Sequence, residues 1–237
     1  MRHYTASETG LLLIDVQKGF DHPTHWGTSW STPNFEANIT AILAAFRKAG
    51  SSVFHVCHHS TFETSPLHPS KASSGFMPYV APIATEPAFA KTTNSPFLET
   101  TLKEAIQAAG INRLVVVGLI TSHCIATTIR TAANLNVVAH TYGTPPTDGA
   151  TQGALVLVSD ATATPDVYYA GRHYDAETVQ AIQLATMKDE FCDIETTLEV
   201  LSRLGTDESA KDVHRREVGV GRGLHTAVGI NGNSSKL

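Results

Sequence analysis

Short apolar runs alternate along this chain with amphipathic segments. Nearly continuous runs of Val, Ile and Leu occupy residues 11–16, 52–57, 114–119 and 154–160, and shorter candidates occupy residues 88–91 and 191–194. A strand that is buried on both faces is apolar throughout, whereas a strand with one face in water alternates. The pattern therefore predicts an α/β fold with three layers, in which an open sheet of about six mostly parallel strands carries helices on both faces.

The amphipathic segments predict helices, and their ends carry recognisable signals. Residues 35–49 place Phe35, Ile39 and Phe46 on one apolar stripe, which Gly50 then ends. Ser95 and Pro96 are typical of an N-cap and a first helical position, so a helix is expected over residues 97–109. Further helices are expected over residues 123–135, 176–189 and 197–204.

Three segments break this alternation. Residues 58–87 are rich in Pro, Ser and Thr without any period, which is typical of a long loop that is either functional or disordered. Residues 136–153 interrupt the expected short link from helix to strand, and we interpret them as a surface insertion, with an artefact of the gene model as the alternative. The apolar periodicity ends after Gly205, so we expect one domain over residues 1–205 and a flexible tail over residues 206–237.

The composition favours a globular protein over several other classes. Hydrophobic residues make up 42% of the chain and charged residues 16%. Lys and Arg number 17 against 22 Asp and Glu, and the resulting formal charge of −5 argues against a nucleic-acid partner. No apolar run approaches the roughly 18 residues that a membrane-spanning helix needs, so we expect no membrane partner. The three cysteines are widely spaced, and neither a disulfide scaffold nor a zinc cluster is expected.

Polar residues follow three of the apolar runs. In an open parallel sheet the ligand crevice lies at the carboxyl ends of the strands, where this chain places Asp15, Lys91 and Cys124. Cys124 lies at the start of a predicted helix, and a helix N-terminus lowers the pKa of a cysteine, which suits a nucleophile. Each residue also has a structural interpretation: Asp15 as half of an ion pair, Lys91 as a solvated surface group, and Cys124 as a small buried hydrophobic residue.

These three residues and the stretches around them resemble the isochorismatase-like superfamily, in its cysteine hydrolase branch. The matching stretches are LLLIDVQKGF, EPAFAKTTNSPFLETTLKEAI, VVVGLITSHCIATTIRTAANL and VSDATAT, and the likeness runs over residues 9–204. Each motif alone is weak evidence for the superfamily. Three motifs in this order, on a matching alternation of apolar runs and amphipathic segments, are specific for it. The resemblance implies an isochorismatase-like sheet with a Rossmann-like strand order.

The resemblance also implies a mechanism. Asp15 would act as a general base, Lys91 would hold Asp15 and stabilise developing negative charge, and Cys124 would attack a carbonyl to form a thioester. A cis peptide bond is expected between Leu119 and Ile120. The backbone amides of Ile120 and Cys124 would then form an oxyanion hole.

The substrate pocket and the question of a metal ion follow from the same resemblance. The expected substrate-binding residues are Phe20, Trp26, His59, Ser60 and His123, each of which could instead be a packing or surface residue. Nicotinamidases of the superfamily bind zinc through an Asp-x-His pair and another His, but the corresponding residues 55–59 of this chain contain no Asp. We therefore expect neither a metal ion nor another cofactor.

The last three residues bear on location. Ser235, Lys236 and Leu237 form the C-terminal signal that the peroxisomal import receptor reads. We expect a peroxisomal protein if the source is eukaryotic and a cytoplasmic one otherwise. The resemblance further implies a homo-oligomer that acts on a small-molecule substrate.

Several functions remain open at this point. The leading hypothesis is a hydrolase that cleaves a non-peptide C–N bond of a small amide or ureide. An isochorismatase-type hydrolase of a vinyl ether would need acid catalysis and no thiol, and a non-catalytic binding protein would have no chemical reason to keep Asp15, Lys91 and Cys124 together. A flavin- or nucleotide-binding protein ranks last, because no glycine-rich loop follows the first strand.

Overall fold

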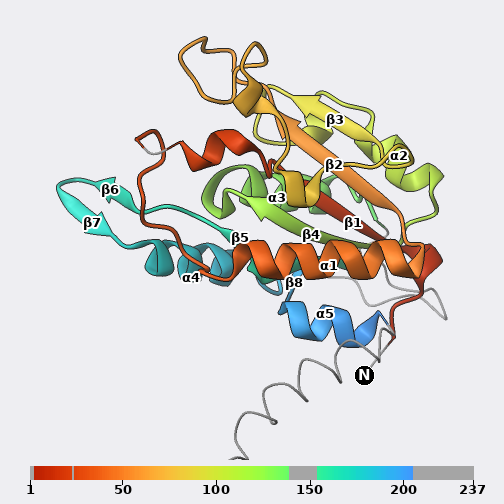
Figure 1. Ribbon diagram of the computed structural model, residues 1–237. Helices are drawn as coiled ribbons and strands as arrows, with labels where there is room; N and C mark the ends of the chain where they lie inside the picture. Colours follow the sequence, from red (N-terminus) through yellow and green to blue (C-terminus); the bar gives the residue numbers. More distant parts are fainter. Residues whose placement is uncertain (1–2, 23, 139–153, 205–237) are drawn as a thin grey trace, which may run out of the picture. The chain divides into compact units, whose positions relative to one another are not determined.

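The centre of the computed structural model is a parallel sheet of six strands (Figure 1), and the structure describes residues 3–22, 24–138 and 154–204. The strand order is β3-β2-β1-β4-β5-β8, and every neighbouring pair is parallel. The strands are β1 (Thr9–Ile14), β2 (Val53–His58), β3 (Ala88–Lys91), β4 (Arg113–Leu119), β5 (Ala154–Ala163) and β8 (Asp193–Glu195). The predicted fold class is therefore confirmed.

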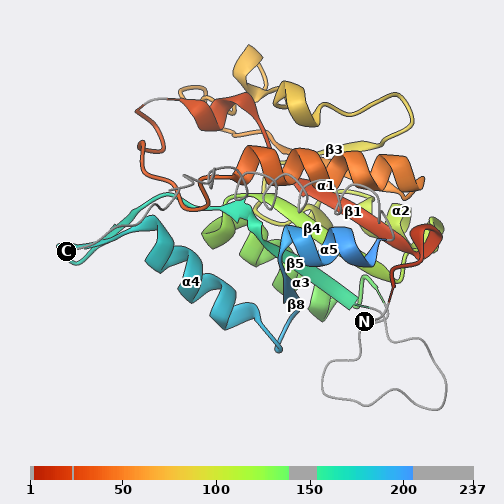
Figure 2. The ribbon, with the colours of Figure 1, turned by 60° about the horizontal axis from the view of Figure 1, so that its bottom comes forward.

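Helices cover both faces of the sheet (Figures 1 and 2). One face packs against α1 (Phe35–Ala49) and α5 (Thr197–Arg203), and the other packs against α2 (Leu102–Ala108), α3 (Ala126–Asn134) and α4 (Ala176–Met187). Successive residues of β1 serve the two cores in turn: Leu11 and Leu13 lie in the core with α1, and Leu12 and Ile14 lie in the other. This double burial explains why β1 is apolar at every position.

Helix ends follow the predicted signals where those signals are local. Helix α1 has the predicted bounds, and Gly50 after it has a φ of 70°, in the left-handed region that glycine adopts freely. Helix α5 begins with a capping box, because the Thr196 side chain accepts from the backbone of Glu199 and the Glu199 side chain accepts from the backbone of Thr196.

The helix predicted over residues 97–109 is shorter than expected. Ser95 does cap a turn, but this turn is a 3-10 segment (Pro96–Leu98), and α2 begins only at Leu102. Glu99, between the two, uses its carboxylate to accept hydrogen bonds from the backbone and side chain of Thr92. The helix predicted over residues 123–135 likewise divides into a π-helical turn (Thr121–Ile125) and α3.

A two-stranded hairpin was not predicted. Strands β6 (Val167–Tyr169) and β7 (Arg172–Tyr174) pair antiparallel, and the turn between them has positive φ at both Ala170 and Gly171. Both strands are largely exposed, so the hairpin carries no alternation of apolar and polar positions. The strand predicted to end at residue 160 also continues to Ala163, with a register shift against β4 between Val116 and Gly118.

The segment between β2 and β3 forms a long connection, as predicted. It contains two short 3-10 turns, Ala72–Ser74 and Pro78–Val80, and its last part is fixed by Glu86. The Glu86 carboxylate accepts from the guanidinium of Arg47 on α1 at 2.7 Å and contacts Nε2 of His55 on β2 at 2.8 Å. The connection is therefore tied to the sheet and to α1 by buried charge.

Two predicted segments lie largely or wholly outside the described residues. Of the expected insertion at 136–153, residues 136–138 are described: Asn136 is exposed, whereas Val137 and Val138 are buried rather than on the surface. Residues 139–153, the tail at 206–237 and its Ser235–Leu237 signal lie outside the described ranges. None of the helices within those ranges has the length and hydropathy that spanning a bilayer requires.

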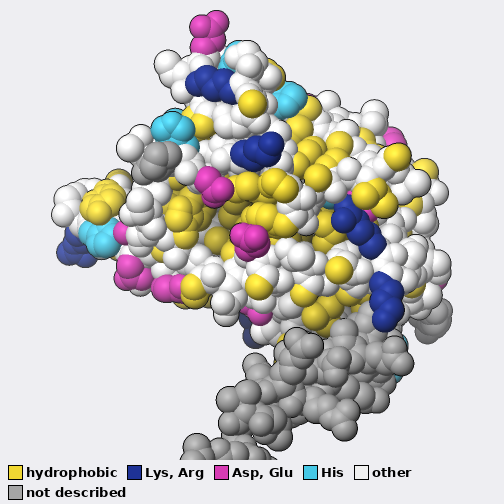
Figure 3. Space-filling model, in the orientation of Figure 1, with side chains coloured by type: hydrophobic (Ala, Val, Ile, Leu, Met, Phe, Trp, Pro, Cys, Tyr) yellow, Lys and Arg dark blue, Asp and Glu magenta, His cyan; other side chains and the backbone are white. Residues whose placement is uncertain are grey.

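On the face where α1 lies, apolar side chains gather with charged groups scattered among them (Figure 3).

Candidate active site

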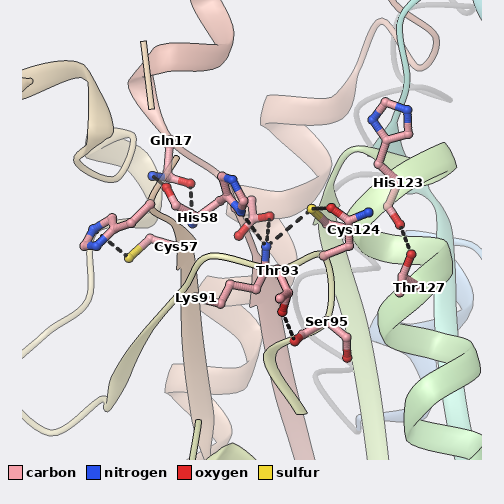
Figure 4. Close-up of polar contacts among 12 residues, drawn as sticks. Gln17, Cys57, His58, Lys91, Thr93, Ser95, His123, Cys124 and Thr127 are labelled. Atoms are coloured by element: carbon pink, nitrogen blue, oxygen red, sulfur yellow. Dashed lines mark hydrogen bonds and ion pairs between the residues drawn. The ribbon is translucent and has the colours of Figure 1, made fainter. Parts of the chain in front are cut away.

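The carboxyl ends of four neighbouring strands bring four chemically active side chains together (Figure 4). Asp15 directly follows β1, His58 ends β2, Lys91 ends β3, and Cys124 lies in the turn after β4. His58 and Lys91 are register partners in the sheet. Parallel strands all present their carboxyl ends at one edge, which is why residues so far apart in the sequence meet there.

Asp15 is held in an unusual backbone conformation and is wholly buried. Its φ is 54°, and its backbone N–H donates to the carbonyl of Val56 at 2.9 Å. The neighbouring strand approaches closely at this level: a Cβ added to Gly118, whose φ is 126°, would collide with the backbone of Ile14. A glycine is therefore needed at residue 118 for β4 to lie against the end of β1.

Lys91 joins the carboxylate to the thiol. Its Nζ lies 2.6 Å from Oδ2 of Asp15 and 3.3 Å from Sγ of Cys124. Both Asp15 and Lys91 have fully buried side chains. The second Asp15 oxygen, Oδ1, has no hydrogen-bond partner among the described residues, so the carboxylate retains a free acceptor.

Cys124 lies in the π-helical turn that leads directly into α3. The Ile120 carbonyl closes this turn by accepting from the backbone N–H groups of His123 at 3.0 Å and Ile125 at 3.2 Å. Cys124 is only 9% exposed, and the exposed Asn94 offers its Oδ1 at 3.9 Å from the sulfur. A carboxylate oxygen of Asp15 and the sulfur of Cys124 lie within 4.8 Å of each other.

The electrostatics of the site differ from the prediction for the thiol. Burial and then the negative charge of Asp15 raise the pKa of Cys124 to about 12, and the Lys91 charge only partly opposes them. The expected lowering of this pKa is therefore wrong, because burial and the charge of Asp15 raise it. At neutral pH the sulfur is a thiol, and it needs a base to become a nucleophile.

The carboxylate and the ammonium are suited to that task. Burial raises the pKa of Asp15 above its usual value, and the Lys91 charge and hydrogen bond lower it only in part. For Lys91, burial alone would lower the pKa, but the charge of Asp15 and the hydrogen bonds to Asp15 and Cys124 raise it, so the ammonium stays protonated. A more basic carboxylate beside a permanent cation is a competent general base.

The backbone around residue 120 has the expected conformation. The peptide bond between Leu119 and Ile120 is cis, as the resemblance implies. Ile120 caps the π-helical turn and Cys124 is its fourth residue. The assignment of their two backbone amides to an oxyanion hole stays a prediction.

The residues expected to bind substrate lie in different surroundings. Phe20 and Trp26 contact each other, with ring centroids 4.8 Å apart, and both belong to a small apolar cluster that includes Leu119 and Ile120. His123 is exposed, and its ring points away from Lys91 (Figure 4).

His59 and Ser60 lie just after the end of β2. The His59 ring contacts Sγ of Cys57 at 3.6 Å, and its backbone N–H donates to the Lys91 carbonyl at 2.8 Å. The Ser60 hydroxyl accepts from the backbone N–H of Phe62. The substrate-binding role of all five residues stays a prediction.

A cavity of about 220 Å³ lies beside the apolar cluster. Its walls are mostly aromatic and apolar, and they include Phe20, Trp30, Phe35, Met77 and Tyr79. Of the five residues expected to bind substrate, only Phe20 lines this cavity.

Sequence reasoning missed His58 and Gln17. The His58 Nδ1 lies 3.4 Å from the Lys91 ammonium, and the Gln17 side chain, which is wholly buried, bonds to the His58 backbone at both its N–H and its carbonyl. The same rule that selected Asp15 and Lys91 applies to His58, because β2 ends one residue later than the apolar run indicates. No comparable signal distinguishes Gln17.

The group Asp15, His58 and Cys124 has the residue types of a metal site, with one ligand atom from each within 4.8 Å of the others. The Lys91 ammonium, however, already contacts all three side chains, at 2.6, 3.4 and 3.3 Å. A metal ion would have to displace this cation or sit against it. The other histidine of the stretch, His55, is buried against Glu86. These residues therefore do not fit the zinc site of nicotinamidases.

Comparison with known proteins gives a consistent result. Residues 9–197 match the model of the isochorismatase domain. The isochorismatase family protein YrdC of Bacillus subtilis (strain 168) is 35% identical over 198 residues, which cover 81% of this chain and 94% of that protein.

Solved structures agree. An isochorismatase family protein from Chromobacterium violaceum is 32% identical with a TM-score of 0.75, and the match covers 86% of this chain and 97% of that one. A cysteine hydrolase from Pseudomonas syringae pv. phaseolicola is 25% identical with a TM-score of 0.72, over 89% and 97% of the two chains. With its strand order, its matching domain and these relatives, the chain belongs to the isochorismatase family of hydrolases.

Proposed function

We propose that this chain is a cysteine hydrolase that cleaves a non-peptide C–N bond of a small amide or ureide through a thioester intermediate. The observation that carries the proposal is the position of the Lys91 ammonium, 2.6 Å from the Asp15 carboxylate and 3.3 Å from the Cys124 sulfur. A general base, a cation and a nucleophile thus meet at the edge of the sheet where ligands of this fold class bind.

Acylation follows from the proton positions. The Cys124 thiol gives its proton to the Asp15 carboxylate, whose Oδ1 is a free acceptor, while the sulfur bonds to the substrate carbonyl carbon. The carbonyl electron pair moves to oxygen, where the backbone amides of Ile120 and Cys124 would stabilise it. When the tetrahedral intermediate collapses, the C–N bond breaks and the amine leaves with the proton from Asp15.

Deacylation repeats the same proton transfers with water. Asp15, again a carboxylate, takes a proton from water as the water oxygen bonds to the thioester carbon. The C–S bond then breaks, the sulfur recovers the proton from Asp15, and a carboxylic acid is released. Lys91 remains an ammonium throughout and offsets the negative charge that moves between carboxylate and sulfur.

The relatives support the nucleophilic mechanism over the vinyl ether alternative. The Pseudomonas syringae neighbour is described as a cysteine hydrolase, and it matches nearly the whole of this domain. Vinyl ether hydrolysis needs no thiol, whereas this site directs a lysine ammonium at one.

The test is a screen for ammonia release from small amides and ureides, combined with intact-protein mass spectrometry to trap an acyl group on Cys124. We expect Cys124→Ala to abolish both signals, and Cys192→Ser, which changes a buried cysteine of the α4 side, to retain them. Full turnover by Cys124→Ala would rule out the thioester. Pyruvate release from isochorismate by that variant would establish the vinyl ether reaction instead, and a site that neither reacts nor turns over would indicate a binding protein.

The remaining expectations extend this proposal. We propose a homo-oligomer, which light scattering of the purified chain would test. We also propose import into peroxisomes in a eukaryotic host, and a fluorescent fusion with and without Ser235–Leu237 would test it; without that signal the expected location is cytoplasmic.

A further inference from the structure

The Lys91 ammonium has three N–H donors, and the structure provides three acceptors for them. Two are Oδ2 of Asp15 and Sγ of Cys124, and the third is Nδ1 of His58 at 3.4 Å. An ammonium cannot accept a hydrogen bond, so this contact requires an unprotonated Nδ1. A hydrogen bond at this contact thus needs a neutral His58 with its proton on Nε2.

The backbone of His58 is fixed by a buried side chain from the segment that follows Asp15. Oε1 of Gln17 accepts from the His58 N–H at 2.8 Å, and Nε2 of Gln17 donates to the His58 carbonyl at 3.1 Å and to the Ser74 carbonyl at 2.6 Å. One glutamine thus satisfies both backbone polar groups of His58. Gln17 lies two residues after Asp15, so the segment that carries the carboxylate also holds the backbone that carries the imidazole.

The charges around His58 favour the neutral form. Burial and then the Lys91 charge lower its pKa, while Asp15 and a backbone hydrogen bond with Thr93 raise it less, and His59 lowers it slightly. A protonated ring would place an N–H against the ammonium, which would repel it.

We propose that His58 is a positioning residue that holds the Lys91 ammonium against Cys124 during the reaction. This inference rests on the proposed function. When Asp15 takes the thiol proton it becomes neutral, and its attraction for Lys91 falls. The His58 acceptor does not change its charge in that step, so it keeps the ammonium directed at the sulfur and at the charge that develops there.

Two substitutions separate this role from packing. His58→Asn retains an acceptor at the same number of bonds from Cβ as Nδ1, whereas His58→Leu removes the acceptor and keeps similar bulk. With para-nitrophenyl acetate as the probe, we expect His58→Leu to acylate Cys124 roughly tenfold more slowly, as the loss of one charge-assisted hydrogen bond implies. His58→Asn should recover most of that rate. His68→Leu, which changes a loop histidine that bonds to Ser70, serves as the matched control.

A spectroscopic measurement tests the contact without relying on the rate. Nitrogen-15 NMR of the parent protein near neutral pH should show His58 unprotonated at Nδ1 and protonated at Nε2. Lys91→Met should raise the pKa of His58, because the lysine charge that lowers it is gone. A His58 ring with its proton on Nδ1, or a pKa that ignores Lys91→Met, would overturn the proposal even if His58→Leu failed to fold.

The outcomes distinguish the two proposals. Equal acylation rates for folded His58→Leu and the parent would refute the positioning role while leaving the hydrolase mechanism intact. Equal losses in the Asn and Leu variants would also refute it, because the acceptor would then be irrelevant. Acylation that persists in Cys124→Ala would refute the hydrolase mechanism itself.

Discussion

Two buried carboxylates of this molecule are alike in their partners and opposite in their chemistry. Asp15 and Glu86 each bind a cationic side chain at 2.6–2.7 Å, and each lies near a histidine of β2. Both Glu86 oxygens are occupied: Arg47 bonds to both, and Oε2 also contacts His55 and the backbone N–H of Ile83. Asp15 has one occupied oxygen and one without a partner among the described residues.

The pKa values follow this difference. Burial alone would raise the pKa of Glu86, but the hydrogen bonds from Arg47, Ile83 and His55 lower it to about 2. Burial raises the pKa of Asp15, and Lys91 offsets it only in part. A carboxylate whose two oxygens both accept hydrogen bonds links parts of the structure. A buried carboxylate with one oxygen that accepts no hydrogen bond can instead accept a proton.

The largest expected effect is on acylation of Cys124. Asp15→Asn removes the base and should slow acylation by para-nitrophenyl acetate about 10²–10⁴-fold, the range typical of general-base catalysis. Glu86→Gln is the matched control, since it neutralises the other buried carboxylate and should leave the rate of the folded protein within about twofold. Equal losses in the two variants would erase the distinction between a reactive carboxylate and a structural one.

The second effect is on stability and concerns Glu86. Glu86→Gln should lower the free energy of unfolding at neutral pH by about 2–3 kcal/mol, because Arg47 and His55 lose a charged partner. The folded-state pKa of about 2 lies below the unfolded value, so this stabilisation is complete above pH ~4.3 and is lost as the pH falls toward 2. Urea unfolding of parent and variant at several pH values measures it, and a difference that grew on acidification would contradict the sign.

The third effect separates the charge of Asp15 from its role as a base. Its negative charge raises the pKa of Cys124, so Asp15→Asn should lower that pKa from about 12 while acylation becomes slower. Lys91→Met should raise the pKa of Cys124, because the lysine charge lowers that pKa in the parent protein. The rate of Cys124 alkylation as a function of pH, with the modified residue identified by peptide mass, records both shifts. A slower variant with an unchanged thiol pKa would show that Asp15 does not face the sulfur.

The two carboxylates also differ in how far the sequence predicts them. Asp15 and Lys91 follow apolar runs, and the rule that ligands bind at the carboxyl ends of parallel strands brings them to one edge. Both ends of α1 were also predicted correctly, because its apolar stripe and the glycine that ends it, Gly50, are local signals. Glu86 could not be paired in advance, since its partners lie on α1 and β2 and meet it only when the connection folds across the sheet.

Prediction failed where no local pattern of apolar and polar residues carried the signal. The pKa of Cys124 depends on how deeply the thiol is buried, which no local pattern records. The hairpin β6–β7 has exposed side chains on both strands, so it lacks the alternation that reveals a half-buried strand. His58 escaped notice only because β2 runs one residue past its apolar run.

The smallest effect concerns the histidine of the structural carboxylate. His55 is fully buried, and its Nε2 bonds to Glu86 while its Nδ1 has no partner among the described residues. His55→Gln, whose side-chain N–H can reach Glu86, should be less destabilising than His55→Leu, which should cost about 1 kcal/mol. Burial lowers the pKa of His55 in the folded state, so the parent should lose stability as the pH falls below about 6.5, and neither variant should show that part of the loss. Urea unfolding at pH values on either side of that point measures both differences. If His55→Leu were as stable as the parent and equally sensitive to acid, His55 would contribute nothing to stability, and Arg47 and the backbone N–H of Ile83 would account for the low pKa of Glu86.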